Sequence, residues 1–312
     1  MLKRPVLIDT DPGVDDAFAI MLAQSFKSID IVGLTVTSGN VSLNHTLRNT
    51  LGLCEAINMD VPVYKGATAP LVEQARYADE FHGNNGFGGY EFKEIKKQPE
   101  SMPAWDAIRY YAEKYDGELE ILSLGPPTNI AIALLKYPEL NTMIKRIVFM
   151  GGSLTTGNTE PLSEFNFWCD PHATQVVFNS NISMQMVGLD VTRQGLLPLE
   201  DLKEIKSENP KFEHLLRYLS DFYAGISHRS GYGSNLHIPD AVAAFAFCYP
   251  EHCSWQPMNI KCITSTGRMQ GWTKVDHCIN TNAKPNVLAA TSTNQAEFIK
   301  CMKGVGWILW VN

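Results

Sequence analysis

The chain has 312 residues, and its 33 acidic side chains outnumber its 26 lysines and arginines, which gives a formal net charge of −7. A negatively charged protein is not attracted to a phosphate backbone, so we do not expect nucleic acid as a partner. No apolar run is long enough to span a bilayer, and the amino terminus enters the first apolar segment without room for a signal peptide. These features predict a cytoplasmic protein that makes no contact with a membrane.

Neither a linker nor a repeat divides the sequence, and a chain of this length can bury one large apolar core. We therefore predict a single domain over residues 1–312. The seven cysteines are scattered and never form a C-x-x-C pair. This spacing is unlike that of a disulfide framework or a zinc site, and it predicts reduced, mostly buried thiols.

Short β-branched and apolar runs alternate with longer segments of helical periodicity. The pattern predicts strands at residues 6–8, 31–36, 121–124, 147–150 and 184–189, and helices at residues 16–24, 43–57, 104–114, 129–135 and 171–179. Strands separated by helices imply crossover connections. The expected fold class is therefore α/β, with a mainly parallel, doubly wound central sheet of the Rossmann type.

Polar residues follow each predicted strand, at the edge where open α/β sheets bind their ligands. The densest group follows the first strand, where four aspartates occur within eight residues: Asp9, Asp11, Asp15 and Asp16. Such a group would repel itself without a counterion. Acidic residues also favour the first turn of a helix, but that alternative explains Asp15 or Asp16 and not the two aspartates at the strand end.

A bound cation explains the whole aspartate group, and the lack of nearby cysteine or histidine favours a hard ion. The residues themselves leave Ca²⁺ and Mg²⁺ as alternatives.

The segment DTDPGVDDA at residues 9–17 resembles the signature of the inosine-uridine nucleoside hydrolase family. Further matches follow in order at residues 36–42, 81–83, 125–131, 150–152, 163–166 and 170–173. An ordered set that spans nearly the whole chain is far more specific than one D-x-D match. The sequence is most similar to the bacterial ribonucleoside hydrolases that accept both purine and pyrimidine nucleosides.

This resemblance implies a nucleoside hydrolase fold and a calcium-dependent enzyme of nucleoside salvage. Its substrate would be a small ribonucleoside, whose N-glycosidic bond is cut by water to give free base and ribose. The matching Ca²⁺ ligands are Asp11, Asp16, the main-chain carbonyl of Leu124, and Asp240. Asp11 also matches the general base, which takes a proton from a water held by the metal as the reaction passes through an oxocarbenium-like state.

The same resemblance implies residues that bind the two halves of the substrate. The positions that match ribose-binding groups are Asp15, Asn40, Met150, Asn158, Glu164 and Asn166. For the loop that contains Asn158, composition alone favours a solvated segment, and only the resemblance favours a site. His82 matches a residue near the nucleobase, and Phe165 is expected to pack against the base.

One position departs from the family pattern. Many members carry a histidine directly before the last calcium-binding aspartate, where it protonates the departing base, but this chain has Pro239 there. Proline has no proton to donate. The candidate leaving-group acids nearby are His237, Tyr232 and His228, with Arg229 beside them. For His237, a surface position on a loop is an equally good interpretation.

Two other functions compete with the hydrolase. A non-catalytic nucleoside-binding homologue would keep the ribose and calcium sites and lose turnover with the histidine. A haloacid-dehalogenase-type phosphatase would use Asp9 and Asp11 as nucleophile and acid, but that family expects threonine or valine where this chain has Gly13.

The resemblance also implies a homodimer or homotetramer. The apolar carboxyl-terminal run at residues 305–311 is a candidate interface, and docking of that run on the chain's own core is the alternative.

Overall fold

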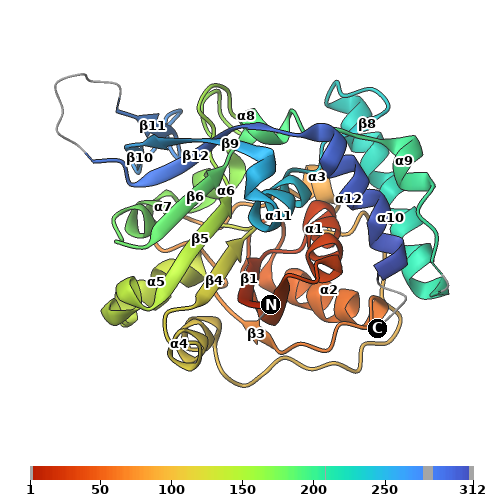
Figure 1. The fold of residues 1–312 in the computed structure, drawn as a ribbon, viewed down its shortest axis with the longest axis horizontal. Helices are drawn as coiled ribbons and strands as arrows, with labels where there is room; N and C mark the ends of the chain where they lie inside the picture. Colours follow the sequence, from red (N-terminus) through yellow and green to blue (C-terminus); the bar gives the residue numbers. More distant parts are fainter. Residues whose placement is uncertain (1–2, 208, 277–283, 309–312) are drawn as a thin grey trace.

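The computed structural model describes residues 3–207, 209–276 and 284–308, with side chains described up to residue 305. Its centre is an eight-stranded sheet in the order β3-β2-β1-β4-β5-β6-β12-β9 (Figure 1). The strands are β1 (Arg4–Thr10), β2 (Ile29–Val36), β3 (Val63–Lys65), β4 (Leu119–Ser123), β5 (Ile144–Met150), β6 (Ser183–Val187), β12 (Val287–Thr293) and β9 (Cys253–Met258). All neighbouring strands are parallel except β12 and β9.

Helices cover both faces of this sheet, as the alternation of strands and helices predicts. One core cluster packs the sheet against α1 (Val14–Ser25), α2 (Leu43–Ala56), α10 (Pro210–Arg229), α11 (Pro239–Cys248) and α12 (Gln295–Ile308). The other packs it against α4 (Ala104–Lys114), α5 (Thr128–Lys136) and α7 (Pro171–Phe178). The predicted α/β, doubly wound, mainly parallel fold is confirmed.

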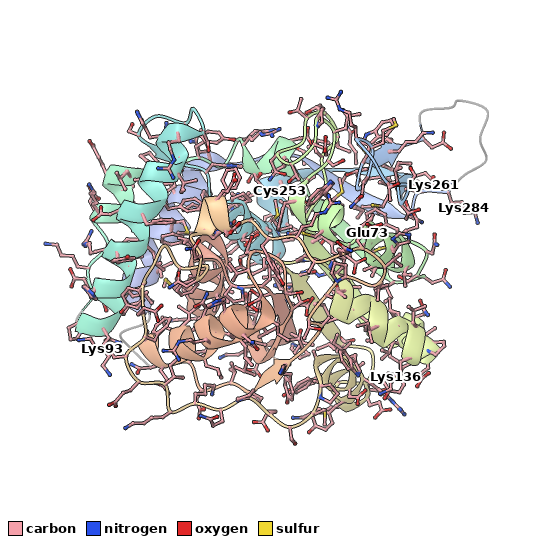
Figure 2. All side chains as sticks on the ribbon, turned by 180° about the vertical axis from the view of Figure 1, so that it is seen from behind. Glu73, Lys93, Lys136, Cys253, Lys261 and Lys284 are labelled. Carbon is pink, nitrogen blue, oxygen red and sulfur yellow. The ribbon has the colours of Figure 1, made fainter. Side chains whose placement is uncertain are left out.

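Shorter elements lie at the edges of the sheet. They are α3 (Asp79–His82), η1 (Pro138–Thr142), α6 (Phe165–Cys169), α8 (Leu189–Thr192), α9 (Leu199–Lys203) and η2 (Pro250–His252), with the two small antiparallel pairs β7 (Leu197–Pro198) with β8 (Asn235–Leu236) and β10 (Ile260–Cys262) with β11 (Thr273–Val275). Charged side chains such as Lys93, Lys136 and Lys284 project outward from the surface (Figure 2).

The predicted elements agree with the structure apart from their ends. The largest difference is at β5, which begins at Ile144 and not at residue 147. Strand β6 stops at Val187, before its predicted end at residue 189, because the chain turns at Gly188 and begins α8 at Leu189. Five residues of β1 in succession are buried, which is typical of a parallel strand covered on both faces. Because both faces of β1 are buried, its sequence does not alternate between polar and apolar residues.

The structure bears on three expectations, which concern the cysteines, membrane-spanning helices and the apolar carboxyl-terminal run. The six described cysteines are free thiols, and four of them are buried, as expected. Within the described ranges no helix has both the length and the apolar character needed to cross a bilayer. Val305 is buried in the core, and the rest of the apolar carboxyl-terminal run has no described side chains.

Candidate active site

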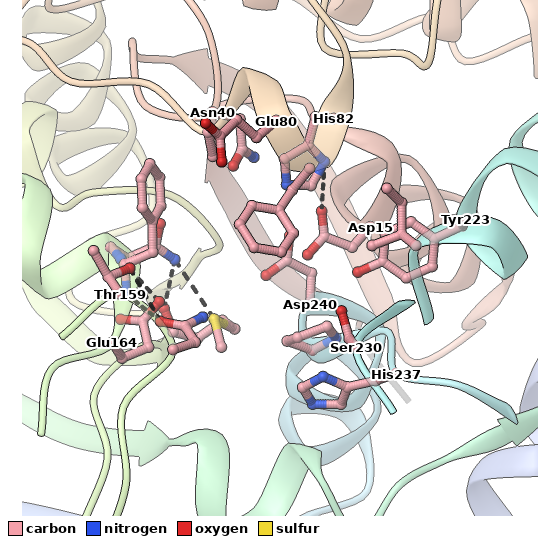
Figure 3. Close-up of a pocket in the computed structure, with 18 of the residues that line it drawn as sticks. Asp15, Asn40, Glu80, His82, Thr159, Glu164, Tyr223, Ser230, His237 and Asp240 are labelled. Atoms are coloured by element: carbon pink, nitrogen blue, oxygen red, sulfur yellow. Dashed lines mark hydrogen bonds and ion pairs between the residues drawn. The ribbon is translucent and has the colours of Figure 1, made fainter. Parts of the chain in front are cut away.

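A large cavity opens where the order of the strands reverses. The chain passes from β1 to β2 and β3 on one side, and later to β4, β5 and β6 on the other. Asp11 follows β1, and Leu124 follows β4. The cavity has a volume of about 520 Å³ and lies at this carboxyl edge (Figure 3). The position agrees with the general rule for open α/β sheets.

A group of aspartates lies at one wall of the cavity, which Asp15 and Asp240 line directly, whereas Asp11 and Asp16 are fully buried and are not among the lining residues. Asp15 and Asp16 lie in the first turn of α1, and Asp240 lies in the first turn of α11. Each of these three residues offers a carboxylate oxygen within 4.8 Å of those of the other two. The positive ends of the two helix dipoles favour negative charge there. Burial nevertheless raises the pKa of Asp15 and of Asp16 to about 6, and burial with the neighbouring aspartates raises that of Asp240.

Asp11 lies in a space that only glycine neighbours allow. Its Oδ2 accepts a hydrogen bond from the Asn40 backbone N–H at 2.6 Å. A methyl group on Gly39 would lie 2.0 Å from Asp11 Oδ2, and one on Gly125 would lie 2.4 Å from Asp11 Oδ1. Burial, followed by repulsion from Asp16, raises the pKa of Asp11 well above its usual range. The backbone therefore approaches both carboxylate oxygens closely.

Asp16 is held in place by several donors. Its Oδ1 accepts a hydrogen bond from Thr10 Oγ1 at 2.5 Å, and its Oδ2 accepts one from the Gly13 N–H at 2.9 Å. Asn40 Nδ2 donates to the same Oδ2 at 3.1 Å and to the Asp11 carbonyl at 3.2 Å. The Asn40 side chain thus orients the aspartates as well as lining the cavity.

The chemistry of these oxygens suits a hard cation. Asp11 Oδ1 and Asp15 Oδ1 are buried, and neither has a hydrogen-bond donor within the described ranges. Buried carboxylates without donors are costly unless a cation satisfies them. The Leu124 carbonyl accepts a bond from Asn166 Nδ2 at 2.6 Å and retains a second lone pair. The three carboxylates whose oxygens lie within 4.8 Å of one another belong to Asp15, Asp16 and Asp240. The resemblance instead assigns Asp15 to ribose and Asp11 to the metal.

The predicted ribose-binding residues line another part of the cavity. Glu164 caps α6: its Oε1 accepts from the Asn166 N–H at 2.8 Å, and its Oε2 accepts from the Gly152 N–H at 2.9 Å. Burial raises the pKa of Glu164 to about 7. Asn166 Nδ2 also donates to the Met150 carbonyl at 3.0 Å. The exposed Asn158 accepts a bond from the Phe165 N–H at 3.0 Å through Oδ1.

His82 lies on the wall opposite Glu164 (Figure 3). Its Nδ1 accepts a hydrogen bond from the Val14 N–H at 3.2 Å. A backbone N–H can only donate, so a neutral His82 carries its proton on Nε2. Burial lowers the pKa of His82 to about 4, which keeps the ring neutral at physiological pH. His82 Nδ1 lies 3.7 Å from Asp15 Oδ1, too far for a hydrogen bond.

The candidate leaving-group acids separate into two groups. His237 and Tyr232 line the cavity, and so does Pro239, whereas His228 and Arg229 are exposed near the end of α10 and do not. All of these residues lie close to Asp240 in the sequence, but successive residues at the end of a helix point in different directions, so only some of them reach the cavity.

Several cavity residues were not predicted from the sequence, among them Arg193, Tyr223 and Trp168. Arg193 directly follows the polar residues after β6. Reading the polar segment after that strand one residue further would have included it. Tyr223 lies on α10 with Ile226 and Ser227, which are three and four residues later and also line the cavity. A helical periodicity search of that segment would have placed them on one face.

An oxygen-lined, acidic cavity at the switch point of a parallel sheet is the site of an α/β enzyme that acts on a small molecule. The family model of the inosine-uridine preferring nucleoside hydrolases matches residues 6–300. The non-specific ribonucleoside hydrolase RihC of Klebsiella pneumoniae subsp. pneumoniae is 38% identical over 275 residues, which cover 88% of this chain and 89% of the relative. The same enzyme of Escherichia coli O1:K1 is 38% identical with the same coverage.

Solved structures agree with this family. A purine-preferring ribonucleoside hydrolase from Gardnerella vaginalis superposes with a TM-score of 0.91 at 29% identity, over 99% of this chain and 100% of that one. A plant nucleoside hydrolase superposes with a TM-score of 0.90 at 26% identity, over the full length of both chains. The protein belongs to the inosine-uridine preferring nucleoside hydrolase family, and it is an enzyme of that class. This membership argues against the phosphatase alternative.

Proposed function

We propose that the protein is a calcium-dependent ribonucleoside hydrolase, which uses water to cut the bond between nucleobase and ribose. The observation that carries the proposal is the group of buried aspartates around one cavity, two of which have a carboxylate oxygen with no donor in the described part of the chain. Relatives named as non-specific ribonucleoside hydrolases support a substrate range that includes both purine and pyrimidine nucleosides.

The residues that would hold Ca²⁺ are Asp11, Asp16, the Leu124 carbonyl and Asp240, with Asp15 within reach of the same position. The bound ion would supply positive charge that neutralises the carboxylates and makes a nearby water more acidic.

Asp11 is the proposed general base. Asp11 Oδ1 is buried and has no hydrogen-bond donor within the described ranges, so it is available to accept a proton from a nearby water. As the water oxygen bonds to the anomeric carbon, its proton passes to Asp11, and the electrons of the broken C–N bond leave with the base. The surrounding carboxylates stabilise the positive charge that develops on the ribose.

Ribose hydroxyls would be bound by Asp15, Asn40, Met150, Asn158, Glu164 and Asn166, all of which line the cavity. Several of these side chains are already fixed by hydrogen bonds, so they position the sugar with little loss of conformational entropy. The base would lie near His82 and Phe165.

Tyr232 is the stronger candidate for the leaving-group acid. His228 lies outside the cavity, and burial lowers the pKa of His237 to about 3, so little of its ring is protonated at neutral pH. Tyr232 lines the cavity and has a hydroxyl proton to donate.

The family resemblance further supports a homodimer or homotetramer. Light scattering coupled to size-exclusion chromatography tests the assembly.

The direct test of the function incubates the purified protein with inosine, uridine, cytidine and adenosine and follows free ribose as reducing sugar. We expect release that a calcium chelator stops and added Ca²⁺ restores. Release that survives complete chelation contradicts the calcium dependence. No release from any substrate, together with tight calcium-dependent binding, indicates the non-catalytic homologue instead.

A further inference from the structure

His237 occupies a fixed position in the cavity wall (Figure 3). It follows β8, which pairs with β7, and it precedes α11, which begins at Pro239. Only Ile238 separates it from that helix, and Ile238 is fully buried. The backbone of His237 is therefore held on both sides, and its ring cannot move far from the cavity.

Thr192 fixes the orientation of the His237 ring. Its Oγ1 lies 3.0 Å from His237 Nε2, and Thr192 itself is fully buried at the end of α8. The same hydroxyl lies 3.4 Å from the Leu189 carbonyl, in position to donate to it. When the hydroxyl proton points to Leu189, Thr192 accepts the bond, and Nε2 is the ring nitrogen that carries hydrogen.

The other ring nitrogen of His237 is available to a ligand. Nδ1 has no hydrogen-bond partner within the described ranges and is not among the fully buried unpartnered atoms there, and the His237 side chain belongs to a residue that lines the cavity. The Tyr232 ring lies against the imidazole, with the two centroids 4.8 Å apart. Burial and the charge of Arg193 oppose protonation of the ring. Nδ1 is then a hydrogen-bond acceptor.

The residues proposed to bind ribose do not include His237, which leaves the nucleobase as the part of the substrate that it can contact. We propose that His237 is a specificity-determining residue whose Nδ1 accepts a hydrogen bond from a ring N–H or amino group of the base, and that Thr192 orients it for this role. The inference rests on the proposed function and deepens it. It assigns His237 to recognition of the base and not to protonation of the leaving group.

The test compares uridine with 3-methyluridine, in which a methyl group replaces the ring N–H. A matched control is 5-methyluridine, which adds the same methyl group at a carbon. For the full-length wild-type protein with Ca²⁺, we expect kcat/KM for 3-methyluridine to be roughly three- to tenfold lower than for uridine, the effect of one lost hydrogen bond. The value for 5-methyluridine should stay closer to that for uridine.

His237→Phe keeps a flat ring against Tyr232 but removes both nitrogens. We expect this variant to lose the discrimination, because KM for uridine rises while the value for 3-methyluridine changes little. Thr192→Val should weaken the discrimination, and Thr192→Ser, which keeps the hydroxyl, should restore it.

An unchanged ratio of uridine to 3-methyluridine in His237→Phe overturns the inference. An equal fall in kcat for both substrates with constant KM also overturns it, since that result identifies a leaving-group acid. If the wild-type protein releases no ribose from uridine, the proposed function fails. Calorimetric affinities for the same ligands then test the inference alone, and equal affinities for uridine and 3-methyluridine in the wild-type protein contradict it.

Discussion

At the scale of single residues, the site depends most on Asp11, whose carboxylate has backbone close to both oxygens and one oxygen without a donor within the described ranges. Asp11→Asn keeps the shape of the side chain but removes most of its basicity. We expect kcat to fall by about 10²- to 10⁴-fold, the usual contribution of a general base. Ribose release under saturating Ca²⁺ and nucleoside measures the change.

The control for Asp11→Asn is calcium binding, followed by titration calorimetry. We expect weaker binding, because an amide oxygen replaces a charged ligand. Turnover within threefold of wild type would show that another group takes the proton.

Pro239 stands where the family resemblance implies a histidine, and it lines the cavity at the start of α11. Pro239→His places an imidazole at that position. We expect kcat for inosine to rise by roughly tenfold or more, within the range that a positioned acid contributes, and the inosine-to-uridine ratio to increase. The ratio is obtained from initial rates with both nucleosides. An unchanged ratio would show that a histidine at this position does not reach the leaving group.

At the scale of elements, the loops after β2 and β4 meet at Asp11 through Gly39 and Gly125. A methyl group on Gly125 would displace the carboxylate by contact at 2.4 Å. We expect Gly125→Ala to lower kcat by at least about 100-fold, because a small displacement of a catalytic group has a large effect. It should also destabilise the fold by about 1–3 kcal/mol through overpacking.

A matched control is Gly304→Ala, because among the described residues nothing outside its own stretch of α12 lies within 4 Å of the added methyl group. That change should leave activity unaltered and raise the free energy of unfolding by up to about 1 kcal/mol through helix propensity. Kinetics and urea unfolding are measured on both variants. Full activity in Gly125→Ala would mean that the loop yields without moving Asp11.

Local patterns predicted the elements whose side chains repeat within a short window. Strands β1, β2, β4, β5 and β6 were recognised, as were helices α1, α2, α4, α5 and α7 and the polar edge that the strands form. The antiparallel pairing of β9 with β12 was not, because pairing between distant segments leaves no local periodicity.

Within the site, too, residues that lie close together in the sequence were predicted, and residues that only the fold brings together were missed. The aspartates after β1 were found because four charges lie close together in the sequence. Tyr223 and Arg193 were missed because they lie far from the aspartates in the sequence, on α10 and directly after α8, and the packing of the fold brings them to the cavity. Conversely, His228 was proposed from its place near Asp240 in the sequence, although the end of α10 turns it to solvent.

At the scale of the whole molecule, the acidic wall makes folding depend on pH and on the cation. The pKa values of Asp15 and Asp16 are raised from 3.8 to about 6. In protein without a cation, these groups therefore cost stability progressively as pH rises from about 4 to about 6, and the loss is complete above that window. A bound divalent ion reverses the effect by favouring the ionised carboxylates.

We therefore expect Ca²⁺ to raise the Tm more at pH 8 than at pH 5, by a difference on the order of 5 °C. Differential scanning calorimetry with and without chelator measures both shifts. Equal shifts at the two pH values would indicate that the aspartates are already ionised in the protein without the cation.

The walls of the cavity come from separate parts of the fold. Asp15 lies on α1 and Asp240 on α11 at the centre, whereas Phe81 and His82 come from α3, and Tyr223 and Ile226 come from α10. Under the proposed function, we expect mutations in α3 and α10 to alter which base is accepted while the aspartates stay in place. Such a division would allow new substrate preferences to evolve by single substitutions, without passing through an inactive ancestor.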